Sequence, residues 1–191
     1  MFTIIRNTLR KSRGALIGWG IGLAALAIMM GSMFDMMVAS NEMIDVVNAY
    51  TVAMPELAAM FKMDEMGTPI GWLDVEYFSF VPLIIGLFAT GVGANMLARD
   101  EEDGTLDLIL AHPVSRTALF WGRFLANTLV IIILLLISWA SLLLPMTWSE
   151  NFSIPAFDLL LPFVSMFGIM LFFMTLSLLF GMLLPARSMA R

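Results

Sequence analysis

The stretch LFWGRFLANTLVIIILLLISWASLLL, residues 119–144, decides the fold, because its only charged side chain is Arg123. A helix crosses the ~30 Å hydrocarbon core of a bilayer with about 20 apolar residues. Only helices and closed barrels pair all their backbone polar groups in lipid, and barrel strands are shorter and alternate in polarity. We therefore predict a membrane-spanning helix here. Arg123 lies one turn inside it, near enough to the interface for its guanidinium to reach polar surroundings.

Three other apolar stretches have the same character, and they lie at residues 15–34, 77–97 and 159–184. The composition agrees with them, since 60% of the 191 residues are apolar and 13% are charged, against about 45–50% and about 25% in soluble domains. The sequence thus predicts an all-α fold, in which a single membrane domain, residues 1–191, forms a polytopic bundle of four transmembrane helices. Four spans leave no room for a separate soluble domain.

The basic residues indicate the orientation of this bundle. Of the ten Lys and Arg residues, only Lys62 falls on the other side of the predicted spans from the rest. Loops rich in Lys and Arg stay in the cytoplasm. We therefore expect a multi-pass protein of the plasma membrane with both termini cytoplasmic. The basic residues on the cytoplasmic side are Arg6, Arg10, Lys11, Arg13, Arg99, Arg116, Arg123, Arg187 and Arg191.

The N-terminal segment, residues 1–13, has two different helical faces. A helix of this kind lies in the membrane interface, in contact with membrane lipid. The alternative is a short juxtamembrane segment with ordinary cytoplasmic charge. We predict the interfacial helix. Its apolar face has Phe2, Ile5 and Leu9, and its basic face has Arg6, Arg10 and Arg13.

Residues 35–76 form an acidic extracytoplasmic loop in this topology, because they are too polar to cross the membrane. We expect a short helix at residues 55–61 and a turn at residues 67–71, just before the second span. Trp72 and Tyr77 lie at the outer start of that span and are expected to anchor it at the interface. One side of the short helix consists of Met54, Leu57, Met60 and Phe61.

Several kinds of chemistry are excluded by what the sequence lacks. There is no cysteine, so thiol nucleophiles, disulfides and zinc-thiolate sites are excluded. No Gly-Lys pair exists, so there is no phosphate-binding loop of the Walker type. The single histidine, His112, has no second histidine for a metal site, and no predicted span carries a carboxylate or lysine at mid-membrane. We therefore expect a protein that is not an enzyme and has no cofactor. Any uphill transport would draw its energy from another subunit.

The loop at residues 98–117 is the most specific segment of the chain. It begins as a charged helix exit, and Gly104 then ends the helix. Thr105 is suited to cap a new short helix, whose apolar residues begin at Leu106 and end before Pro113. Such a helix either docks into a groove of a partner protein or rests on the inner surface of the membrane.

At this loop the sequence resembles a known family, the ABC-2 type permeases, which are membrane subunits of bacterial exporters. The similarity extends to the order of elements over nearly the whole chain: a basic N-terminal helix, a first span, an acidic outer loop, a second span and this loop. The matching residues are Glu101-Glu102-x-Gly104-Thr105-Leu106-Asp107, then Pro113-Val114-Ser115-Arg116, then Gly122-Arg123.

The resemblance implies a permease subunit of an ATP-driven exporter. Permeases of this family pair as homodimers or with a second permease subunit, and they bind separate ABC ATPase subunits on the cytoplasmic side. The loop between spans two and three acts there as a cytoplasmic coupling helix, and the N-terminal helix also contacts the ATPase. No nucleic acid partner is implied, in agreement with the net charge of −5. Carried over to this chain, the coupling residues are Glu101, Glu102, Gly104, Thr105, Leu106 and Arg116.

Two features depart from the family pattern. Its members commonly have six spans, whereas four are predicted here, and Arg123 stands where lysine is more usual. The first departure leaves an alternative open: a non-transporting membrane scaffold or regulatory fragment that lacks the last two spans. Because the predicted spans lack central charges, we expect the substrate to be amphipathic, either drug-like or lipid-like.

Small residues on two spans are candidates for close helix packing, either within the bundle or in a dimer. The alternative is that glycine is simply tolerated in membrane helices. The first span carries glycines at intervals of four residues, and the second has a similar face. The predicted packing residues are Gly14, Gly18, Gly22, Gly86 and Gly93.

Overall fold

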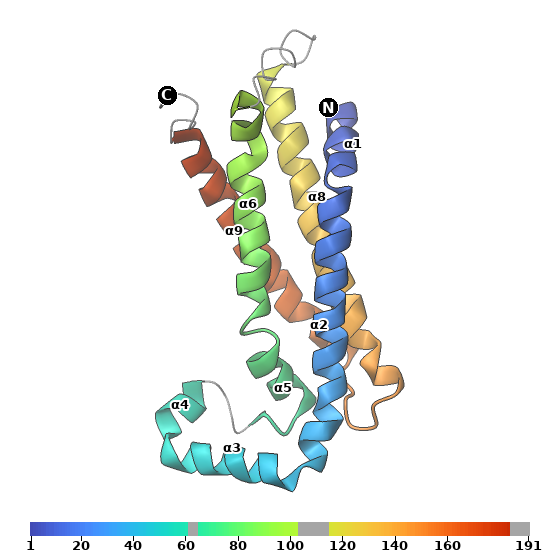
Figure 1. Ribbon diagram of the computed structural model, residues 1–191, viewed down its shortest axis with the longest axis vertical. Coiled ribbons are helices and arrows are strands. Elements are labelled where there is room, and N and C mark those ends of the chain that lie inside the picture. The colour runs from blue at the N-terminus through green and yellow to red at the C-terminus, as the bar shows by residue number, and fades with distance from the viewer. Residues whose placement is uncertain (61–64, 103–114, 184–191) are drawn as a thin grey trace. The chain divides into compact units, whose positions relative to one another are not determined.

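The computed structural model describes residues 1–60, 65–102 and 115–183, with the backbone alone at residues 41–43 and 97–102. Within these ranges the chain is helical and contains no strand (Figure 1). The fold class is therefore all-α, as predicted. The elements are α1 (Phe2–Lys11), α2 (Arg13–Ala39), α3 (Asn41–Ala53), α4 (Pro55–Met60), α5 (Pro69–Glu76), α6 (Val81–Glu102), α8 (Arg116–Leu143), the short 3-10 helix η2 (Pro145–Thr147) and α9 (Ala156–Leu183).

Three helices in the described part of the chain are long and apolar enough to cross a membrane, namely α2, α8 and α9. The pair formed by α5 and α6 passes the same test together, although the two helices are bent by 45° at their break. The expected number of four spans is therefore reached if this bent pair acts as one broken span. The chain is a multi-pass membrane protein in either case.

The second span differs from the continuous helix that we predicted for residues 77–97. The chain leaves the helix after α5 and starts again at Val81. The end of α5 is closed by hydrogen bonds: the Tyr77 and Phe78 amides donate to the Leu73 carbonyl at 2.9 Å and 2.7 Å, and the Ser79 hydroxyl donates to a carbonyl in α5 at 2.8 Å. Pro82 then stands in the first turn of α6, where its missing N–H costs no hydrogen bond.

The predicted outer loop is largely helical, since α3, α4 and α5 occupy most of it. The predicted short helix exists as α4, but its buried residue is Ala58, and the three described residues of the predicted apolar side are about half exposed or more. The turn at residues 67–71 is shorter than expected. Thr68 accepts a hydrogen bond from the Gly71 amide at 3.1 Å and so caps α5, which begins one residue later. The exposed residues are Met54, Leu57 and Met60.

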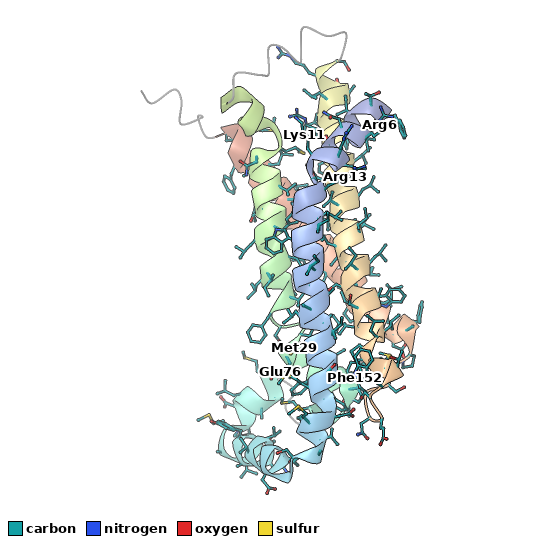
Figure 2. The ribbon with its side chains drawn as sticks, turned by 45° about the vertical axis from the view of Figure 1, so that its right-hand side comes forward. Arg6, Lys11, Arg13, Met29, Glu76 and Phe152 are labelled. Carbon is teal, nitrogen blue, oxygen red and sulfur yellow. The ribbon has the colours of Figure 1, made fainter. Side chains whose placement is uncertain are left out.

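Backbone contacts divide the chain into two compact units, each formed by segments that are distant in sequence. One unit consists of Gly18–Leu83 and Leu134–Ser165. Its core contains an aromatic cluster in which the ring of Phe34 lies 6.3 Å from the ring of Trp72 and 5.8 Å from that of Phe152. Figure 2 labels Phe152 in this unit.

Two residues of this unit were predicted to anchor the chain at the membrane interface, and that prediction was wrong. Trp72 is only 4% exposed, and its indole N–H donates to the Met30 carbonyl of α2 at 2.9 Å. Tyr77 is fully buried, and its hydroxyl is hydrogen-bonded to the Ser138 hydroxyl of α8. Both aromatic side chains therefore tie helices together inside the protein.

The other unit consists of Met1–Ile17, Ile84–Ile133 and the described part of Met166–Arg191. In it α6 and α9 approach closely at Gly93, where an added Cβ would lie 2.3 Å from the Met174 carbonyl oxygen. The Ser177 hydroxyl of α9 donates to the Thr90 carbonyl of α6 nearby. This unit also contains α1 and the first half of α8, and with them the residues that the family signature singles out.

Candidate coupling site

Two consecutive residues near the start of α8 contact two different helices. We call the group formed by Ile4, Met96, Gly122 and Arg123 the α8 junction. Gly122 is buried, and an added Cβ there would lie 2.9 Å from Cγ2 of Ile4 and 3.0 Å from its Cβ. Because a β-branched side chain adjusts little at these atoms, only glycine allows α1 to pack this closely on α8.

The next residue of the junction connects α8 to α6. The guanidinium Nη1 of Arg123 donates to the Met96 carbonyl oxygen at 2.8 Å. This hydrogen bond to a charged donor is of the stronger kind, and it satisfies the arginine at the edge of a membrane span. Our prediction placed Arg123 near the interface, and the structure adds its partner, a backbone carbonyl close to the end of α6.

The start of α8 is capped by a residue of the signature that our sequence analysis did not assign to this role. The Ser115 hydroxyl accepts a hydrogen bond from the Ala118 amide at 3.1 Å. Serine is a preferred N-cap residue, and its place directly before a long helical run was the signal for it. Ser115 therefore fixes where the loop ends and α8 begins.

The predicted coupling residues lie on both sides of this point. Glu101 and Glu102 form the end of α6, and Arg116 is the exposed first residue of α8. The remaining three, with the expected coupling helix, lie outside the described residues, so their roles stay predictions. They are Gly104, Thr105 and Leu106.

The N-terminal segment forms α1, and its placement in the membrane interface stays a prediction. Ile4, Ile5 and Leu9 are half-buried, whereas Phe2 is 77% exposed. The basic side chains of this segment are all exposed, and Figure 2 shows one of them on α1 and two where α1 meets α2. They are Arg6, Arg10, Lys11 and Arg13, of which Figure 2 labels Arg6, Lys11 and Arg13.

The glycines predicted to pack helices fall into two groups. Gly93 lies against α9, and an added Cβ at Gly86 would contact Phe173 at 3.9 Å. The three on α2 have no atom of this chain within 4 Å of an added Cβ, and all are exposed. A role for them in contacts with another chain remains a prediction. These three are Gly14, Gly18 and Gly22.

Catalytic and metal chemistry finds no support in the described residues. They contain no group of three His, Cys, Asp or Glu side chains that would hold a metal ion. The buried polar side chains among them are Asn127, Ser138 and Ser141. An amide and two hydroxyls inside a helical bundle stabilise packing and supply no acid or base for a reaction.

Comparison with known proteins agrees with the signature residues. A family model described as "ABC-2 family transporter protein" matches residues 2–191. The chain belongs to the ABC-2 transporter family. No curated protein and no solved structure shows significant similarity to it. This ABC-2 protein is therefore a membrane permease component of an ABC transporter. Membership implies partnership with an ABC ATPase, and the family is a transport component that is not itself catalytic.

Proposed function

We propose that this permease docks a separate ATPase subunit through residues 98–117 and forms part of the membrane pathway of an exporter. The α8 junction is the observation that carries the proposal. The helices on both sides of residues 103–114 are α6 and α8, and Arg123 ties them together at Met96. The adjacent Gly122 joins α1 to the same turn of α8. A displacement of this loop would therefore reach three helices at once.

The charges at the helix ends support docking. Glu101 and Glu102 lie at the negative end of the α6 dipole, and Arg116 lies at the positive end of the α8 dipole. A solvent-exposed charge of the same sign as the helix end destabilises the helix by about 0.3–1 kcal/mol. A partner with complementary charges would offset this cost, which favours an interface over an ordinary solvated loop.

The expected substrate is amphipathic, either drug-like or lipid-like. Away from their ends, the described parts of α2, α8 and α9 carry no charged side chain except Arg123, and that side chain is bonded to α6. Apolar helix surfaces favour substrates with apolar bodies, because a charged solute would lose its hydration without receiving compensating partners.

Capture of the ATPase in detergent tests the docking proposal. The full-length chain is purified with the ABC ATPase encoded in its gene neighbourhood, as wild type and as Glu101→Ala, Glu102→Ala and Gly104→Pro. We expect the wild type to retain the ATPase and the three variants to lose most of it. Glu150→Ala is the matched control, since Glu150 is an exposed acid in the connection between α8 and α9.

Equal capture by the loop variants and the control would contradict docking through residues 98–117. No capture by a well-folded wild type would favour the scaffold alternative. Circular dichroism and size-exclusion chromatography of each variant separate lost docking from lost folding.

A further inference from the structure

The strongest unused feature of the molecule is the basic face at its N-terminus. The first acidic residue of the sequence is Asp35, so the first 34 residues carry four cations and no anion, although the chain as a whole has a net charge of −5. All four cations are exposed. Within the part of the chain that the structure describes, none of them has an ion-pair partner. The four are Arg6, Arg10, Lys11 and Arg13.

Three of these cations form a row along one side of the helix. Arg6, Arg10 and Arg13 are spaced by four and three residues, which places them on one helical face. Ser12 is the C-cap of α1, and its amide still donates to the Thr8 carbonyl at 2.9 Å, so Arg13 follows this last turn of α1 directly as the first residue of α2. The row covers roughly 10 Å of helix axis.

Like charges at this spacing repel one another, so the row destabilises α1 unless anions lie against it. Arg13 makes the conflict larger, since it is the first residue of α2 and stands at the positive end of the helix dipole. The opposite side of α1 is held by Ile4 on Gly122 of α8. The row is therefore held in an exposed position, and no acidic side chain that the structure describes is paired to it, the side chains of residues 97–102 not being among those described.

The position of the row along the membrane span identifies the source of the anions. Arg13 begins α2, a helix that is long and apolar enough to cross a bilayer, so the arginine lies at the level of lipid headgroups. Phe2, 77% exposed, adds an apolar side chain suited to the boundary between headgroups and acyl chains. Phosphate groups of lipids are present at this depth and supply anions along the exposed side of the row.

We propose that Arg6, Arg10 and Arg13, assisted by Lys11, form a binding surface for anionic phospholipid headgroups in the leaflet that meets the N-terminus. Each basic residue near an anionic surface strengthens binding by about fivefold. Bound lipid holds α1 in place, and with it the contact between Ile4 and Gly122 in the α8 junction. This inference does not depend on the ATPase partner or on the substrate.

Lipid selectivity of the full-length chain tests the proposal. The protein is reconstituted in nanodiscs that contain both phosphatidylcholine and phosphatidylglycerol, and native mass spectrometry then counts the lipids of each kind that stay bound. We expect the wild type to be enriched in phosphatidylglycerol. Replacing the three arginines together, as Arg6→Gln, Arg10→Gln and Arg13→Gln, is expected to lower that enrichment by about tenfold or more.

The matched control replaces the same three arginines by lysine, as Arg6→Lys, Arg10→Lys and Arg13→Lys. The positive charges are kept, and we expect the enrichment in phosphatidylglycerol to be retained. Both nanodisc leaflets have the same composition, so an altered orientation does not affect the result. Equal binding of the two lipids by the wild type would overturn the proposal. The proposal would also be overturned if the triple glutamine variant, with unchanged helicity, bound phosphatidylglycerol with the same enrichment as the wild type.

Discussion

Gly122 and Arg123 are neighbours in sequence, but one position excludes a side chain and the other needs a long one. Gly122 needs the absence of a side chain, because Ile4 of α1 occupies the space where a Cβ would stand. Arg123 needs a long cationic side chain that reaches the Met96 carbonyl of α6. A lysine keeps the charge but has a different donor geometry. Together the two residues give a physical reason for a glycine followed by a long cationic side chain at this point of α8.

Substitution of Gly122 tests the packing at this point. Gly122→Ala is expected to destabilise the protein by about 1–3 kcal/mol, because the new methyl group meets Ile4 at 2.9 Å. Thermal unfolding in detergent measures the change. Gly91→Ala is the control, since Gly91 is a glycine of α6 with nothing within 4 Å of an added Cβ.

The control is expected to be neutral or slightly stabilising, because alanine favours a helix more than glycine does. If Gly122→Ala behaved like Gly91→Ala, the close contact between α1 and α8 would be refuted. Adding Ile4→Ala to Gly122→Ala removes the nearest methyl group and is expected to restore part of the lost stability.

At the element scale the bend between α5 and α6 is the main departure from regular spans. Tyr77 occupies the break, and its hydroxyl is bonded to Ser138 of α8. The Tyr77 ring also packs near Phe78 and Phe163, with centroids 5.3 Å and 6.4 Å away. A bent pair is stable only if the residues at its break are held by neighbouring helices, and here Tyr77 has this role.

Removing one hydroxyl tests the role of the break. Tyr77→Phe is expected to cost about 1 kcal/mol, because it deletes an interhelical hydrogen bond and leaves the Ser138 hydroxyl, which is fully buried, without this partner. Unfolding by SDS titration, followed by tryptophan fluorescence, measures the cost. Tyr50→Phe changes the only other tyrosine, which is 53% exposed on α3, and is expected to change nothing. Equal effects of the two changes would show that the hydroxyl of Tyr77 does not hold the break.

The elements differ in how far the sequence alone predicted them. The helices α2, α8 and α9 begin and end within about five residues of the first, third and fourth predicted spans, because the length of an apolar run is visible in the sequence. The helices α3 and α5 were missed, since their helical pattern is weak and they lie in a polar segment. Trp72 and Tyr77 were assigned to the interface because their partners, Met30 and Ser138, are far away in sequence.

The coupling roles of the candidate site stay predictions. The signature singled out residues at both ends of the loop, and the structure has Arg116 as the first residue of α8. Spacing alone did not reveal the Ser115 cap or the contacts of Gly122 and Arg123, because these depend on how α1 and α6 pack on α8. The same limit applies to glycine spacing, which did not distinguish Gly93, packed against α9, from the exposed Gly22.

At the scale of the whole molecule the chain is a permease component whose described residues offer no catalytic or metal-binding group. Membership of the family implies partnership with an ABC ATPase, and we propose that this partner supplies the energy. Our central claim is that this ATPase docks at residues 98–117, between α6 and α8. The other end of α8 leads into its connection with α9, and this connection supplies an internal comparison.

Site-directed crosslinking tests this claim most directly, because the chain has no cysteine and every thiol is an introduced one. Thr105→Cys and Glu150→Cys are prepared separately, and each is mixed with the ATPase and a short thiol-to-amine crosslinker. We expect a crosslinked product of permease and ATPase from Thr105→Cys and none from Glu150→Cys. Equal products from both positions, or a product from Glu150→Cys alone while the complex stays intact, would contradict docking through this loop.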